Sequence, residues 1–88
     1  EVVTRISTSG GRHWGINVGN YRSRGDAEAV LLRTVLSELG TLEGSLRKVV
    51  AKQTGFDANF YGMTRDAAAL ACRRLAARKQ TCSTIGPG

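Results

Sequence analysis

Hydrophobic and polar residues alternate in one stretch near the start of the chain. Trp14, Ile16 and Val18 are separated by small or polar residues, and this two-residue period is typical of a strand with one buried face. Gly19-Asn20 then interrupts the pattern with residues that favour turns. The pattern therefore predicts a strand that begins at Trp14 and is broken at Gly19-Asn20.

A capped helix is predicted to follow this strand. Ser23 stands three residues before Asp26 and resembles a capping box, with Asp in place of the usual Glu or Gln. The apolar positions that follow at helical spacing are Ala27, Leu31, Val35 and Leu39, widened by Leu32 and Leu36. The pattern predicts a helix over residues 26–39 that ends at Gly40. Its apolar stripe is broad enough to pack on both a sheet and a neighbouring helix.

The same order of patterns returns in the second half of the chain. Residues 56–60 alternate again, with Phe at both ends, and Tyr61-Gly62 interrupts them. Thr64 then precedes an alanine-rich helical stretch. Two copies of one strand-to-helix junction in a short chain predict a β-α-β-β-α-β order.

The remaining elements complete this order. Residues 41–45 are predicted to be a loop, 47–53 a second strand, 54–55 a hairpin turn and 82–85 a short final strand. The predicted fold class is α+β and ferredoxin-like. In that fold two helices cover one face of a four-stranded antiparallel sheet, and the other face stays open.

The chain is predicted to hold one domain over residues 13–86. Residues 1–12 contain a Ser-Thr-Ser-Gly-Gly run typical of a linker, and residues 87–88 form a short tail. Glu1 is not a natural start, which predicts that the chain is part of a longer protein. No apolar run reaches the roughly 20 residues of a membrane helix, and no signal peptide is visible.

Two cysteines lie where the fold brings elements together. Cys72 shares the apolar face of the second helix with Ala68, Ala71 and Leu75, and Cys82 begins the final strand beneath that face. A bridge between them would stabilise the fold by roughly 3 kcal/mol and would indicate an oxidising compartment such as the periplasm. The alternative is a pair of reduced cysteines that act as small core residues.

The predicted register also defines the open face of the sheet. If Trp14, Ile16, Val18, Phe56, Ala58 and Phe60 face the helices, then Gly15, Asn17, Gly19, Asp57 and Asn59 face outward. That outward set is polar, flat and nearly free of bulky groups. It is suited to hydrogen bonds with a polar polymer.

The sequence gives little indication of catalysis. Ser45 and Lys48 match a Ser-x-x-Lys spacing, but a serine acyl-enzyme needs that element around a deep pocket in a much longer chain. No paired carboxylates, metal-ligand spacing or phosphate-binding glycine loop is present. We therefore expect a domain that is not an enzyme and takes no metal or cofactor.

The stretch Ile16-Asn-Val-Gly-Asn-Tyr21 resembles the first strand of SPOR domains, the sporulation-related modules that bind bacterial peptidoglycan. That strand reads approximately aliphatic-Gln-Val-Gly-Ser-Phe and is followed by a short loop and an alanine-rich helix. The resemblance covers residues 13–85. The segment from Cys72 to Cys82 also resembles the SPOR domain at the C-terminus of alphaproteobacterial D-alanyl-D-alanine carboxypeptidases.

This resemblance implies a ferredoxin-like fold whose open sheet binds glycan strands stripped of their stem peptides. The glycan-binding residues that it implies are Asn17, Asn20, Tyr21, Asp57, Asn59 and Ser83. The tryptophan that some family members carry at the start of the third strand is replaced here by Gly55, flanked by Phe56. The implied location is the periplasm or cell envelope, enriched at the septum, where the domain would localise an attached cell-wall enzyme.

The charge of the chain leaves two other classes open. Thirteen basic and seven acidic residues give a net charge of +6, which suits polyanions or polar cell-wall polymers. An RNA-recognition motif has the same order of elements but needs outward aromatic residues on its first and third strands. The other alternative is a protein-interaction module of the division machinery. The orientation of Phe56 and Phe60 distinguishes the glycan from the RNA prediction.

Overall fold

The computed structural model describes residues 11–87. The predicted linker over residues 1–12 lies outside this range except for its last two positions. The elements, in chain order, are β2 (Trp14–Tyr21), α1 (Arg24–Ser37), α2 (Leu39–Leu42), β3 (Leu46–Lys52), β4 (Gly55–Met63), α3 (Arg65–Ala77) and β5 (Ser83–Ile85).

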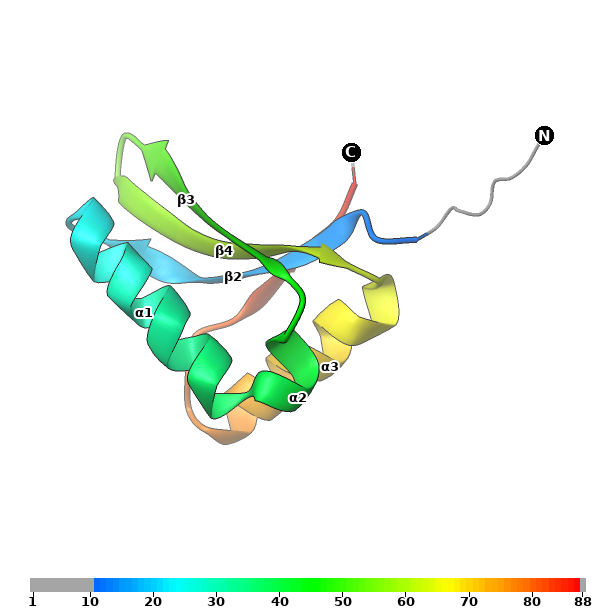
Figure 1. Cartoon of the computed structure of the whole chain (residues 1–88). Coiled ribbons are helices and arrows are strands. Elements are labelled where there is room, and N and C mark those ends of the chain that lie inside the picture. Colours follow the sequence, from blue (N-terminus) through cyan, green and yellow to red (C-terminus); the bar gives the residue numbers. More distant parts are fainter. Residues whose placement is uncertain (1–10, 88) are drawn as a thin grey trace.

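The four strands form one antiparallel sheet in the order β3-β4-β2-β5. The two strands that follow the helix-forming segments lie at the edges, and β2 and β4 lie side by side in the centre. Figure 1 shows the helices on one face of the sheet, with the opposite face uncovered by any described helix. The predicted α+β, ferredoxin-like fold is confirmed.

Both predicted helix caps are confirmed, although α1 begins at Arg24, two residues before the predicted start at residue 26. The Ser23 hydroxyl accepts a hydrogen bond from the Asp26 backbone N–H at 3.0 Å, and the Thr64 hydroxyl accepts one from Ala67 N–H at 3.0 Å. Each bond satisfies one of the backbone donors that a helix leaves unpaired at its first turn.

The predicted end of the first helix is wrong. Helix α1 ends at Ser37 instead of Leu39, because the chain leaves helical geometry at Glu38. A second short helix, α2, then takes up part of the predicted loop over residues 41–45. Leu42 lies on this short helix and is completely buried, so its burial explains why the segment folds back toward the core.

Two predicted strand ends are also wrong. Strand β2 continues through Gly19-Asn20 to Tyr21, and β4 continues through Tyr61-Gly62 to Met63. Both glycine residues have positive φ angles, +120° at Gly19 and +80° at Gly62. The strands accommodate them as local irregularities instead of ending there. The hairpin turn is formed by Gln53 and Thr54, one residue earlier than predicted.

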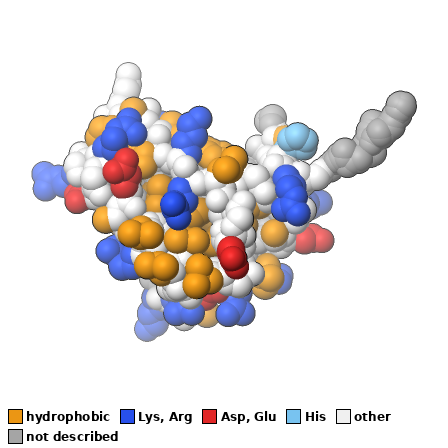
Figure 2. Space-filling view, viewed as in Figure 1, with side chains coloured by type: hydrophobic (Ala, Val, Ile, Leu, Met, Phe, Trp, Pro, Cys, Tyr) orange, Lys and Arg blue, Asp and Glu red, His pale blue; other side chains and the backbone are white. Residues whose placement is uncertain are grey.

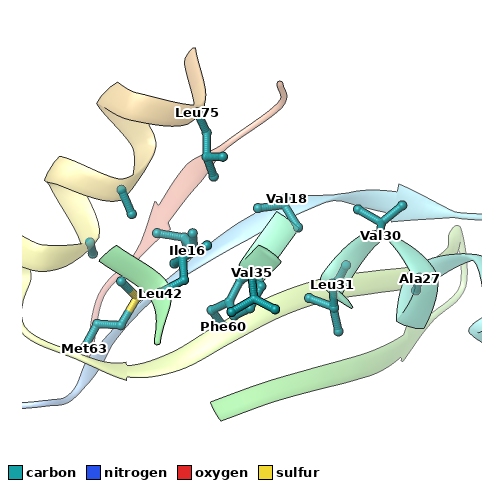
Figure 3. Packing of buried hydrophobic residues seen from close by; sticks show 13 residues of the cluster. Ile16, Val18, Ala27, Val30, Leu31, Val35, Leu42, Phe60, Met63 and Leu75 are labelled. Carbon is teal, nitrogen blue, oxygen red and sulfur yellow. The ribbon is translucent and has the colours of Figure 1, made fainter. Parts of the chain in front are cut away.

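The core lies between the sheet and the helices, as Figure 3 shows. Its sheet side consists of Ile16 and Val18 from β2 and of Ala58 and Phe60 from β4. The helices contribute Ala27, Val30, Leu31, Val35, Leu42, Ala68, Ala71 and Leu75. The predicted alternation of these strand residues toward the helices is thereby confirmed.

Cys72 and Cys82 form a disulfide, with their Cα atoms 5.2 Å apart. The bond joins α3 to the residue immediately before β5 and packs partly buried against the core. It fixes the start of an edge strand that has only three residues.

The broad apolar stripe of α1 is only partly covered. Leu32 is 52% exposed and Leu36 is 61% exposed, although the sequence predicts that they pack on a neighbouring helix. The short helix α2 contacts both α1 and α3, and the two longer helices diverge from it, as Figure 1 shows. None of the helices in residues 11–87 is long and apolar enough to cross a membrane.

Candidate functional site

A β-bulge in β2 determines which side chains reach the open face. Asn17 lies opposite Asn59, and Asn20 lies opposite Asp57. Two residues of β2, Val18 and Gly19, therefore stand against a single residue of β4. Since side chains alternate strictly in an undisturbed strand, Asn17 and Asn20 would point to opposite faces; the extra residue brings them to the same one.

A row of four polar residues crosses the whole sheet on this face. Ser83 of β5 lies directly opposite Asn17, Asn17 opposite Asn59, and Asn59 opposite Lys48 of β3. We call Ser83, Asn17, Asn59 and Lys48 the polar row. Directly paired residues of an antiparallel sheet project to the same face, so the row spans about 14 Å at the usual spacing of strands.

The two asparagines at the centre of the polar row are joined by hydrogen bonds. Asn17 Nδ2 donates to Asn59 Oδ1 at 2.7 Å, and Asn17 Oδ1 accepts from the Gly19 backbone N–H at 3.1 Å. Asn59 is only 4% exposed, and its Nδ2 donates to the Tyr61 hydroxyl at 2.8 Å. Most of the hydrogen-bonding capacity of Asn17 is thus used inside the protein, so this side chain holds the face together.

A second polar group lies next to the row, toward the hairpin between β3 and β4. Asn20 Nδ2 donates to Asp57 Oδ1 at 2.8 Å and to the Thr54 hydroxyl at 3.2 Å. Lys52 Nζ lies 3.8 Å from Asp57 Oδ2. The Asp57 carboxylate is therefore shared between an amide and an ammonium group, and the Asn20 carbonyl oxygen stays available to a ligand.

Tyr61 adds an aromatic ring to the open face that sequence reasoning missed. It lies two residues after Asn59 on β4, directly opposite Leu46 of β3, which is 67% exposed. A Cβ added at Gly15 would lie 3.0 Å from the Tyr61 ring, so the glycine leaves room for the ring over β2. The alternation of Asp57, Asn59 and Tyr61 is the signal that places this ring outward.

Tyr21 lies on the other side of the sheet, away from the polar row. It is opposite Phe56 and packs against the hydrophobic core. Its hydroxyl donates to the Val18 carbonyl at 2.6 Å. Burial raises the pKa of Tyr21 above its ordinary value, partly offset by the positive charge of Arg33. Of the six predicted glycan-binding residues, the structure brings Asn17, Asn20, Asp57, Asn59 and Ser83 to one face and separates Tyr21 from them.

Phe56 and Phe60 both point toward the helices. Phe60 is completely buried in the core, and the Phe56 ring lies 5.4 Å from the guanidinium of Arg24 on α1. These two rings are therefore not available on the open face. Tyr61 is the one aromatic side chain there among the residues that the structure describes.

The open face is flat. Three hollows in the described surface have volumes of about 280, 420 and 270 Å³. Lys48, at the end of the polar row, lines the first of them, whereas Asn17, Asn59 and Tyr61 line none of the three. In the same part of the chain no three His, Cys, Asp or Glu residues are grouped so that they could hold a metal ion. A flat surface with polar groups in a line suits an extended polymer better than an enclosed small molecule.

No family model, no curated protein and no solved structure matches this chain.

Proposed function

We propose that the open face of the sheet binds the glycan strands of peptidoglycan. The observation that carries this proposal is the polar row, which crosses all four strands beside the half-buried Tyr61 and the exposed Leu46. Sugar rings have hydroxyl and acetamido groups at their edges and apolar C–H faces. The exposed Asn20 amide oxygen, Ser83 hydroxyl and Lys48 ammonium group, on the same face as the Tyr61 ring, offer a partner to each of these parts.

The end of the polar row suggests a reason for a preference for stripped glycan. Removal of the stem peptide from N-acetylmuramic acid leaves a free lactyl carboxylate on the sugar. Lys48 is exposed at the β3 end of the row, and the net charge of +6 attracts anionic polymers over a longer range. The Lys48 contact favours denuded strands over strands whose lactyl groups are capped by peptides, whereas the net charge attracts both, because stem peptides carry carboxylates of their own.

The proposed role of the domain is to localise an attached cell-wall enzyme. The resemblance to SPOR domains points to a D-alanyl-D-alanine carboxypeptidase acting at septal or remodelling sites. The disulfide between Cys72 and Cys82 supports an oxidising compartment such as the periplasm.

Co-sedimentation with purified peptidoglycan sacculi tests the proposal. We expect stronger retention on amidase-denuded sacculi than on native ones. Tyr61→Ala and Lys48→Ala should each weaken binding to denuded sacculi by about tenfold, the equivalent of about 1.4 kcal/mol. The matched control is Arg47→Ala, because Arg47 is the adjacent basic residue of β3 and lies opposite the buried Phe60, on the other face.

Equal retention on native and denuded sacculi would contradict the role of Lys48. Loss of binding in Arg47→Ala but not in Lys48→Ala would move the site to the other side of the sheet. Asn17→Ala is a poor probe of ligand contact, because its amide is already bonded to Asn59 and Gly19, and the change would disturb the face itself.

Nucleic-acid binding is a second candidate function for the same face. A single outward ring, Tyr61, offers one stacking position, whereas RNA-recognition motifs stack bases on two strands, and the corresponding central residue of β2 is Asn17. Binding of single-stranded RNA that is lost in Tyr61→Ala, without retention on sacculi, would favour this candidate. Retention on neither polymer would favour a protein partner from the division machinery.

A further inference from the structure

An apolar stripe on α1 lies on the side of the helix that faces away from the sheet. Leu32 and Leu36 are 52% and 61% exposed, and Leu39, just beyond the end of α1, is 49% exposed. Figure 2 shows hydrophobic side chains gathered over this helix layer. Leucine residues are seldom left together in contact with water unless another surface covers them.

The stripe has the spacing of a coiled-coil seam. Gly25, Ala29, Leu32 and Leu36 follow one another at intervals of four, three and four residues, and Leu39 lies beyond the end of the helix. This is the alternation of a and d positions in a heptad. The buried residues Ala27, Val30, Leu31, Thr34 and Val35 occupy the opposite side of the same helix. The seam is therefore separate from the face with which α1 packs on its own sheet.

Two opposite charges flank the seam. Glu28 directly precedes Ala29 and takes the g position, and Arg33 directly follows Leu32 and takes the e position. Within residues 11–87 neither of them forms an ion pair. In a parallel pair of helices a g residue meets the e residue five positions later on the partner, and five residues separate Glu28 from Arg33. In an antiparallel pair g positions face g positions and e positions face e positions, so Glu28 would not meet Arg33.

We propose that a second copy of this chain docks on the seam, with its α1 parallel to the first. The two helices pack Leu32 and Leu36 against the same residues of the partner, and Glu28 pairs with the partner's Arg33 on both sides. The pair is symmetric about a two-fold axis along the helices. The interface covers one 14-residue helix, so it falls in the class of small, weak interfaces and dissociates readily on dilution.

This arrangement leaves the open face of each sheet free. The seam lies in the helix layer, so the two sheets lie on the outside of the dimer with their open faces directed away from each other. The dimer would therefore present two sites for extended polymers. The self-association itself does not depend on what those sites bind.

Sedimentation velocity over a range of protein concentrations tests the proposal. The wild type should shift from monomer to dimer as the concentration rises. Glu28→Arg and Arg33→Glu should each weaken dimerisation by about tenfold or more, because each places like charges opposite each other on both sides of the seam. Leu36→Asp should have a similar effect, whereas Arg73→Glu, a charge reversal on the exposed side of α3, should have none.

The decisive sample is an equimolar mixture of the Glu28→Arg and Arg33→Glu variants. In a parallel pair that contains one chain of each variant, both contacts between position 28 and position 33 again join opposite charges. The mixture should therefore form a heterodimer although each variant alone is monomeric. Circular dichroism of each variant checks that the fold is intact. The proposal would be overturned if the wild type stayed monomeric at millimolar concentration or if the mixture failed to associate. It would also be overturned if the stripe bound a different protein and not a second copy of this chain.

Discussion

Gly19 is the residue on which the composition of the open face most directly depends. It occupies the bulge of β2 with a φ of +120°, a conformation that is essentially restricted to glycine. A Cβ added there would also lie 2.6 Å from the Tyr21 hydroxyl oxygen. Both the bulge and the burial of Tyr21 therefore require that residue 19 has no side chain.

Gly19→Ala should lower the free energy of unfolding by about 2 kcal/mol or more. It should also weaken the contact between Asn20 and Asp57, since both depend on the register of the bulge. Chemical denaturation measures the first effect, and chemical shifts of the Asn20 side-chain amide report the second. Gly40→Ala is the control, because no neighbouring atom lies within 4 Å of the added Cβ and its helical site favours alanine.

At this scale the sequence predicts the helix caps well and the bulge poorly. Ser23 and Thr64 act on backbone groups only three residues away, so their role is local and visible in the pattern. Gly19-Asn20 is equally compatible with a turn that ends the strand and with a bulge inside it. The pairing of β2 with β4, which follows much later in the chain, decides between them.

Among the elements, β5 depends most on a covalent link. This strand has three residues and pairs only with β2, and the disulfide precedes it directly. Replacement of Cys72 and Cys82 by Ala should lower the free energy of unfolding by about 3 kcal/mol, through the greater entropy of the unfolded chain. Thermal unfolding with and without dithiothreitol measures this effect. The reductant should destabilise the wild type and leave the double variant unchanged.

Glu38 links the helices through a buried carboxylate. Arg74 Nε donates to one of its oxygens and Arg78 Nε to the other, both at 2.6 Å, and the Glu38 side chain is only 3% exposed. The hydrogen bonds from Arg74 and Arg78 lower the pKa of Glu38 below its ordinary value, against an opposing effect of burial. The junction of α1 and α2 is thereby tied to the last turns of α3.

The lowered pKa predicts how this link responds to acid. Because the folded protein favours the ionised form, the link contributes fully above the ordinary glutamate pKa of about 4.3 and is lost as the pH falls through the lower folded pKa. Glu38→Gln should be less stable than the wild type at pH 7, and the difference should narrow below about pH 4. Urea unfolding at several pH values tests this, with the exposed Glu43→Gln as control. A difference that stays constant with pH would show that the charge of Glu38 is not involved.

Neither of the inter-helix features could be predicted from the sequence. Glu38 lies 36 residues from Arg74, and nothing in its neighbourhood distinguishes it from an exposed glutamate of a helix end. The exposure of Leu32 and Leu36 could not be predicted either. The periodicity of α1 shows which residues are apolar, but not which of them other elements of the fold cover. Cys72 was more accessible to prediction, since helical spacing alone places it on the side of α3 toward β5.

For the whole molecule, the order of patterns is sufficient to predict the fold. Two strand-to-helix junctions of the same kind leave few arrangements of four strands in one sheet, and the structure adopts the order β3-β4-β2-β5. The open face is harder to predict, because one bulge moves every later side chain of its strand to the opposite face of the sheet. Asn20 and Tyr21 lie on the faces opposite to those that strict alternation predicts. The sequence pattern ends the third strand at Phe60, so it does not predict that Tyr61 belongs to the open face.

Three hydrogen bonds that link Gly19, Asn17, Asn59 and Tyr61 across the open face run in one direction. The Gly19 N–H can only donate, so it fixes the Asn17 oxygen as an acceptor and the Asn17 nitrogen as the donor to Asn59. The same reasoning fixes the Asn59 nitrogen as the donor to Tyr61. The Tyr61 oxygen is then already an acceptor, and its own proton is directed to whatever lies above the sheet. The chain of hydrogen bonds therefore ends in a hydroxyl donor, which selects ligands by the oxygen atoms that they present to it.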